Sequence, residues 1–215
     1  MAKETMTIHK ALSKLKSLPD RISTEMERSF VTQNKHSNQK IFGASIADFC
    51  NGAKASYQAV RTLINEENAI KQAIAISNAT TKVNVNGSEM TVAEAIYLKT
   101  QGIKRLESLY DTLRTQLSKA QRMADMENGE RLESRADEYV KALYSGADMK
   151  NLADDVKKVR DAFIESQTVE LVDPLHAEEV CRKLKEYIDG FNAEVDAALS
   201  VSNALNTIEV EYETL

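Results

Sequence analysis

The sequence predicts a mainly α-helical protein, an elongated helical bundle or coiled-coil hairpin that carries a small three-stranded β-sheet at one end. Glycine and proline are scarce, with 7 Gly and 2 Pro among 215 residues, and aromatic residues make up 6%. This composition favours long helices over a turn-rich β-sandwich or a glycine-looped nucleotide fold. Apolar residues recur at helical spacing in four segments, and one short segment alternates around an Asn-Gly pair. We expect a single elongated domain over residues 1–215.

The first helix is predicted to begin at Thr7. Its apolar stripe consists of Ile8, Ala11, Leu12, Leu15, Leu18 and Ile22. Pro19 removes an intrahelical donor, so the helix is expected either to kink at Leu18 or to restart at Pro19. The preceding segment, 1–6, is polar and lacks the apolar stretch of a signal peptide. We therefore expect the protein to be made and kept soluble.

A polar segment without periodicity, residues 31–44, follows and is predicted to be a loop. Loops of this length in compact domains are often functional, so we expect a contact surface here. The candidate interaction residues are Asn34, Lys35, His36, Asn38 and Lys40. Ser45 and Asp48 then resemble a capping box, which opens a helix predicted to end near Asn78.

A β-hairpin is predicted over residues 81–91. The residues from Thr81 to Val85 alternate and are rich in β-branched side chains, and Ser88 to Met90 return antiparallel. Asn86 and Gly87 form the preferred pair for a type I′ turn, and this exposed tip is a second candidate interaction site.

The longest helix is predicted to begin with a capping box made by Thr91 and Glu94. Its stripe alternates spacings of four and three: Val92, Ile96, Lys99, Ile103, Leu106, Tyr110, Leu113, Leu117, Ala120 and Ala124. Such heptads form either an intramolecular core or an oligomer seam. A continuous helix over 91–145 would be about 80 Å long, with Asn128-Gly129 as a possible break.

In the last third of the sequence, we predict a charged helix over 149–166 and a final helix that begins with Asp173-Pro174. A short apolar run at 169–172 lies between them and could be extended. The stripe of the final helix is Leu184, Ile188, Phe191, Val195, Ala198 and Ser202. The segment 207–212 alternates like a strand.

Two predicted helix ends repeat the same triplet, Ser77-Asn78-Ala79 and Ser202-Asn203-Ala204, and each precedes a predicted strand. We expect the two helices to lie parallel and side by side, so that the strand 207–212 joins the hairpin in a three-stranded sheet. The alternative is that similar helix ends recur by chance.

Catalytic signatures are lacking, because the sequence holds no nucleophile elbow, zinc-binding helix motif, Walker loop or dinucleotide fingerprint. His9, His36 and His176 fall in three different elements, and Cys50 and Cys181 suit small packed hydrophobes better than nucleophiles. The carboxylates Glu130, Glu133, Asp137 and Glu138 alternate with arginines as on a solvated helix face. We therefore predict no enzyme activity, cofactor or metal. A net charge of −5 and a sequence pI of about 5.4 predict no nucleic-acid partner, and the lack of an apolar stretch of about 18 residues predicts no membrane partner.

Three segments carry a resemblance to a known family: 7–22, the hairpin from Ser77 to Ile96, and Ser202-Asn203-Ala204. The chain resembles a family of uncharacterised helical proteins encoded by bacteriophages and prophages of Gram-positive hosts. More distantly, it is similar to the small helical bacterial proteins named septicolysins.

The phage resemblance implies a structural or assembly protein of a virion, in a capsid, connector or tail. Its expected partners are itself and other virion proteins, and its expected location is the host cytoplasm and then the particle. The alternative is a soluble intracellular module that modulates a host protein or ligand. A third possibility is a cytolysin-like pore-forming protein.

Overall fold

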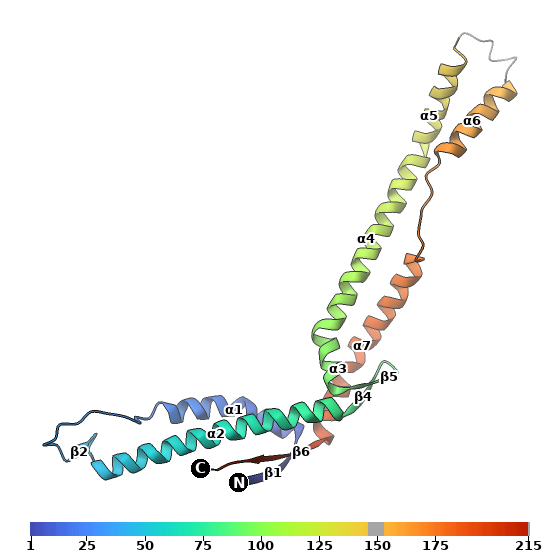
Figure 1. The fold of residues 1–215 in the computed structure, drawn as a ribbon. Helices are drawn as coiled ribbons and strands as arrows, with labels where there is room; N and C mark the ends of the chain where they lie inside the picture. The colour runs from blue at the N-terminus through green and yellow to red at the C-terminus, as the bar shows by residue number, and fades with distance from the viewer. Residues whose placement is uncertain (146–152, 215) are drawn as a thin grey trace. The chain divides into compact units, whose positions relative to one another are not determined.

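The computed structural model describes residues 1–145 and 153–214 and confirms a mainly α-helical fold with short antiparallel strands (Figure 1). The chain divides into two compact units. One contains Met1–Gln101 and Gly190–Leu215, and the other contains Gly102–Asp189. The expectation of a single domain stays a prediction.

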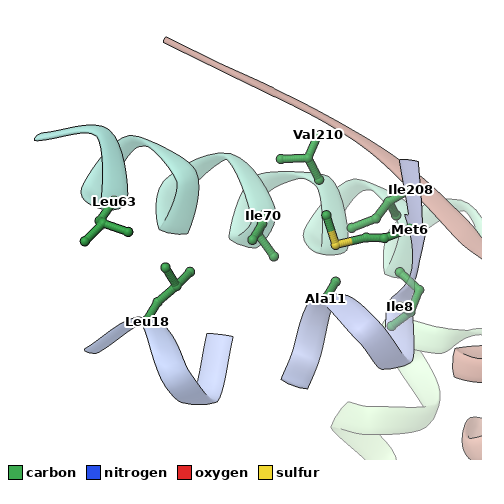
Figure 2. Packing of buried hydrophobic residues seen from close by; sticks show 8 residues of the cluster. All are labelled: Met6, Ile8, Ala11, Leu18, Leu63, Ile70, Ile208 and Val210. Atoms are coloured by element: carbon green, nitrogen blue, oxygen red, sulfur yellow. The ribbon is translucent and has the colours of Figure 1, made fainter. Parts of the chain in front are cut away.

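The first unit is built on two packed helices, α1 (Ile8–Met26) and α2 (Ile46–Thr80), covered by the strand pair β1 (Ala2–Thr7) and β6 (Thr207–Tyr212). Alternate residues of the two strands point toward the helices, as the two-residue period of a strand requires. Figure 2 shows the resulting core. Its buried members are Met6, Ile8, Ala11, Leu18, Leu63, Ile70, Ile208 and Val210.

The predicted hairpin is confirmed, but the predicted three-stranded sheet is wrong. Strands β4 (Lys82–Val85) and β5 (Ser88–Thr91) pair only with each other, across a turn in which Asn86 and Gly87 both have positive φ. Strand β6 pairs instead with β1, in a register that sets Thr207 opposite Thr7. The polar segment at the start of the chain is therefore a strand and supplies the partner that β6 requires.

The repeated triplets do mark helix ends of the same geometry. The Ser77 carbonyl accepts the N–H of Thr81 at 2.8 Å, and the Ser202 carbonyl accepts the N–H of Asn206 at 2.9 Å. These bonds close the last turns of α2 and α7 (Ala177–Leu205), and a strand follows each helix. Helix α2 packs against α1 and β6, and the parallel, side-by-side arrangement of α2 and α7 stays a prediction.

At Pro19 the structure excludes one of the two expected arrangements, and the last helix begins later than expected. Helix α1 continues through Pro19, so there is no restart. The last helix begins at Ala177 rather than at Pro174, because His176 has a φ of 53° and interrupts the turn. The Asp173 carboxylate accepts the N–H of Ala177 at 2.8 Å, so it caps the helix from across that turn.

The long heptad segment is interrupted twice. It consists of α3 (Val92–Tyr97), a π-helical turn η1 (Leu98–Gly102), α4 (Ile103–Asn128) and α5 (Glu130–Leu143). The capping box of Thr91 and Glu94 is confirmed at the start of α3, and the break after Asn128 is confirmed at Gly129. On α4 only Ile103 is fully buried. Further apolar residues of its stripe are half-buried, among them Leu106, Tyr110, Leu113 and Leu117, and Ala120 is exposed.

The second unit contains α4, α5, α6 (Ala153–Gln167) and the first part of α7. Tyr139 of α5 stacks on Phe163 of α6 with ring centroids 4.7 Å apart. The Asn128 side chain exchanges two hydrogen bonds of 2.7 Å with the backbone of Val169. The run 169–172 forms no strand, and the part of the predicted helix at 149–152 lies outside the described residues.

Candidate interaction surface

The predicted loop ends in a small hairpin that the sequence analysis missed. Strands β2 (Lys40–Ile41) and β3 (Ala44–Ser45) pair across the two-residue turn Phe42-Gly43, so the expected loop boundary at residue 44 is wrong. Ser45 then accepts the N–H of Asp48 at 3.1 Å and caps α2, which confirms the predicted helix start. The turn is thereby fixed beside the first turn of a 35-residue helix.

Phe42 occupies an unfavourable position in this turn. Its φ is 48° and that of Gly43 is 84°. A left-handed conformation suits glycine or asparagine, and it costs a bulky L-residue about 1 to 2 kcal/mol. The Phe42 side chain is also 79% exposed. Its ring lies beside that of Phe49, with the ring centroids 6.2 Å apart. The turn thus holds a large apolar side chain in water at a conformational cost.

Other exposed apolar residues lie on the same segment. Val31 is 88% exposed and Ile46 is 44% exposed. We call residues 28–47 the tip segment. Single exposed apolar residues are ordinary on a protein surface, but a large apolar side chain held at a strained turn indicates a contact surface.

The tip segment is basic, although the whole chain carries a net charge of −5. It contains Arg28, Lys35 and Lys40 and no aspartate or glutamate. Arg28 pairs with Glu25 at 3.0 Å, whereas Lys35 and Lys40 make no ion pair among residues 1–145 and 153–214. The surface therefore suits a partner with acidic groups around an apolar cavity.

The five predicted loop residues all lie exposed in the tip segment. Asn34 donates from its side chain to the Asn38 carbonyl at 3.0 Å, and Asn38 donates its N–H to the Lys35 carbonyl at 2.9 Å. These bonds close a compact turn that presents Lys35 and His36 to solvent. The role of these five residues as contacts stays a prediction. Phe42 was not among the predicted contact residues, and its position before a glycine in a predicted loop was the available signal.

The other predicted contact site, the hairpin tip, is docked on the same chain. The N–H of Asn86 donates to Glu194 of α7 at 2.6 Å, and Asn86 is half-buried. A Cβ at Gly190 would clash with the Asn86 side chain, so α7 carries a glycine where the hairpin approaches closely. Gly87 remains exposed at the turn. The tip segment lies at the start of α2 and the hairpin tip follows its end, so the two do not meet.

An ionic cluster in the first unit was not predicted. The Lys14 ammonium lies 2.6 Å from the Glu4 carboxylate and 2.7 Å from the Glu66 carboxylate. The side chain of Glu66 is only 8% exposed. Sequence spacing gives no sign of this cluster, because its members come from β1, α1 and α2 and meet only through tertiary packing.

The cluster favours the charged forms of its members. Burial lowers the pKa of Lys14, but its hydrogen bonds to Glu4 and Glu66 raise it more, so the net pKa is above 10.5. Hydrogen bonds from Lys14 and Lys10 lower the pKa of Glu4 below 4.5. Tyr212 lies nearby, and its pKa is raised by burial and then by the negative charge of Glu66.

The remaining titratable candidates are the two cysteines and the carboxylates of α5. Cys181 is buried as expected, whereas Cys50 is exposed, which corrects its interpretation as a packed hydrophobe. Asp137 pairs with Arg160 at 2.8 Å and its neighbouring carboxylates are exposed, as on a solvated face. Across residues 1–145 and 153–214, no three His, Cys, Asp or Glu side chains are grouped to hold a metal ion. Among the helices described, none has the length and apolarity needed to cross a membrane.

Comparisons with protein-family models, curated proteins and solved structures found no match to this chain.

Proposed function

We propose that this chain is a non-enzymatic structural or assembly protein of a bacteriophage particle, a capsid, connector or tail component. It acts through repeated protein–protein contacts with copies of itself and with other virion proteins. It is synthesised in the host cytoplasm and then incorporated in the virion. The resemblance to a family of phage proteins supports a place in the virion, and the tip segment supports action through protein–protein contacts.

The observation that carries the proposal is the exposed Phe42 ring at positive φ. In the isolated chain this ring costs about 1 to 2 kcal/mol of backbone strain and gains little burial. A partner that covers a phenylalanine side chain recovers about 1.5 to 3 kcal/mol. Backbone strain that persists at a surface is typical of binding sites, so protein contact accounts for both the strain and the exposure.

Quantitative mass spectrometry of gradient-purified particles tests the proposal. The particles are induced from the organism that carries the gene, and copies are counted against a known capsid component. We expect several or more copies per particle for the wild type and a large loss for Phe42→Asn, which keeps the turn and removes the ring. A protein abundant in infected cytoplasm but missing from particles would refute the virion role.

A second candidate function rests on a groove beside Glu66. This groove has a volume of about 750 Å³ between α1 and α2, and Arg21, Gln58, Glu66 and Tyr212 contribute to its lining. A cavity of this size with a few polar groups suits a small ligand or peptide. It favours the alternative of a soluble module that modulates a host protein or ligand. Stoichiometric co-purification of a host protein, lost in Glu66→Gln but kept in Phe42→Asn, would support this alternative.

A further inference from the structure

A second groove in the first unit matches the tip segment in size and charge. It has a volume of about 460 Å³ and lies between the last part of α2 and strand β6. Ala69, Ala73 and Ile76 line it from the helix, and Ile76 is 59% exposed. Glu209 and Glu211 line it from the strand. We call this cavity the α2–β6 groove.

The groove lining combines a short apolar stripe of α2 with polar side chains of the same helix, among them Gln72, Ser77 and Thr80, beside the acidic residues of β6. Ala69, Ala73 and Ile76 follow one another at spacings of four and three, so they form a continuous stripe along α2. Glu209 pairs with Lys3 at 2.9 Å, and Glu211 is exposed. Cavities of a few hundred Å³ hold drug-sized ligands, so this groove has room for a phenylalanine ring.

We propose that the tip segment of one copy of this chain docks in the α2–β6 groove of a second copy, with Phe42 against the helix stripe and Lys40 near Glu211. This inference rests on the proposed function and names the partner of the tip segment. The basic segment and the acidic groove are complementary, and such complementarity selects partners and orientation. Contact between the Phe42 ring and the apolar stripe of Ala69, Ala73 and Ile76 supplies the affinity.

The contact cannot form within one chain. Phe42 lies three residues before Ser45, which limits its reach to about 10 Å from the start of α2. The groove begins at Ala69, about 35 Å farther along the helix at 1.5 Å per residue. A continuous helix separates the two surfaces, so only another copy can bring them together.

The proposed contact is heterologous, because it joins two different surfaces. Such contacts generate a ring if the rotation between copies closes and an open filament if it does not. Each copy would keep one tip and one groove available for the next copy. The arrangement therefore provides the repeated contact that an assembly protein needs.

Charge reversal of the two surfaces, followed by sedimentation velocity of the full chain over a range of concentrations, tests the inference. Wild type is expected to form species larger than the 24.0 kDa monomer. The variant K35E/K40E has an acidic tip and the variant E211K has a more basic groove, and each is expected to be monomeric alone. Mixing the two variants restores complementary pairs at both kinds of contact, so association is expected to return.

Two further variants separate docking from folding. Phe42→Asn relieves the backbone strain of the turn, because asparagine tolerates positive φ. Loss of the ring is expected to weaken association about tenfold to a hundredfold. The thermal midpoint of unfolding is expected to stay equal or to rise. Val172→Asn is the matched control, because Val172 is 87% exposed in the second unit, and it should associate like wild type.

Three results would overturn the inference: a wild type that stays monomeric, a Phe42→Asn variant that associates normally, or a mixture that fails to recover. Binding of wild type to anionic vesicles without self-association would show that the tip segment contacts lipid instead. If copies are found in particles and depend on Phe42 while the mixture test fails, the proposed function stands and the partner is another virion protein.

Discussion

Ile8 donates its backbone N–H to the Asn206 carbonyl at 3.0 Å, and Val92 donates in the same way to the Thr81 carbonyl at 2.9 Å. Both donors are the first residues of helices whose threonine caps, Thr7 and Thr91, lie at the end of a strand. The two acceptors directly follow the last residues of α7 and α2, Leu205 and Thr80. The first unit thus contains the same helix–strand–strand–helix junction twice.

The sequences of the two junctions agree beyond the serine triplets. Met6-Thr7-Ile8 corresponds to Met90-Thr91-Val92, and Ala11 corresponds to Ala95. Ile8, Ala11, Val92 and Ala95 are all buried. When the two junctions are aligned residue by residue, Lys14 of α1 corresponds to Leu98, and Glu66 of α2 corresponds to Phe191 of α7. The ion pair of one junction therefore occupies positions that are apolar in the other.

This correspondence predicts a compensating double substitution. Lys14→Leu or Glu66→Phe alone leaves one partly buried charge with fewer partners and should lower the free energy of unfolding by about 1 to 3 kcal/mol. The double variant K14L/E66F should recover most of that loss, because apolar pairs often replace buried ion pairs without cost. Denaturant unfolding of all four proteins measures the coupling. A double variant as unstable as the sum of the single ones would contradict the correspondence.

The same cluster predicts a pH dependence. A carboxyl with a lowered pKa stabilises the fold above its ordinary value of 4.5, and that stabilisation is lost as pH falls through the lowered value. The raised pKa of Lys14 gives a stabilisation that is complete below 10.5 and is lost as pH rises through the raised value. Stability contributed by the cluster should therefore be flat between about pH 5 and 10 and decrease on both sides.

Glu4→Gln isolates the acid side of this profile. Because the Glu4 side chain is 33% exposed, the expected loss at pH 7 is about 1 kcal/mol or less, and it should shrink below pH 4.5. Glu165→Gln, at an exposed position, is the control and should show no such pH-dependent difference. Equal differences at pH 3 and pH 7 would mean that the Glu4 charge makes no contribution.

The close approach of the hairpin to α7 gives a third prediction. Gly190→Ala introduces a Cβ against the Asn86 side chain and should destabilise the first unit, although alanine normally stabilises a helix interior by about 1 kcal/mol over glycine. Gly52→Ala, in α2 with open space around its Cβ position, should show the normal stabilisation. Thermal unfolding of both variants is the measurement. Asn86→Gly should relieve the clash when combined with Gly190→Ala.

The two hydrogen bonds between the Asn128 side chain and the Val169 backbone, which we call the Asn128 clamp, give a fourth prediction, for the second unit. Asn128→Asp replaces the side-chain donor with an acceptor that faces the Val169 carbonyl at 2.7 Å. We expect faster hydrogen exchange at the Val169 N–H and a stability loss of about 1 to 2 kcal/mol. Gln121→Ala, exposed on α4, is the control. Unchanged exchange at Val169 would show that the clamp does not hold this segment in solution.

The sequence predicts best what depends on neighbouring residues. The hairpin at Asn86-Gly87, the capping box at Thr91 and the break at Gly129 follow from local chemistry and are confirmed. The pairing of β1 with β6 does not, because it joins segments near opposite ends of the sequence. The alternation of Ala2, Glu4 and Met6 was present in the sequence, but Glu4 on the inward face concealed its strand character.

The sequence indicated where the candidate surface lies, but it did not indicate the strained turn at Phe42. A long polar segment without periodicity marks residues 34–40 as a place for contacts, but it does not reveal the strained turn beside it. The φ of Phe42 depends on the pairing of Lys40 with Ser45, which is set by the backbone of β2 and β3. The α2–β6 groove likewise requires the tertiary placement of β6.

The central claim is that the tip segment contacts a protein, and a photoreactive amino acid at position 42 tests it most directly. Irradiation in cells that produce particles should yield covalent adducts with a protein chain, and the α2–β6 groove of a second copy is the expected site of attachment. The same amino acid at Val172, an equally exposed position, is the control. Adducts no more abundant than those from position 172 would contradict the claim.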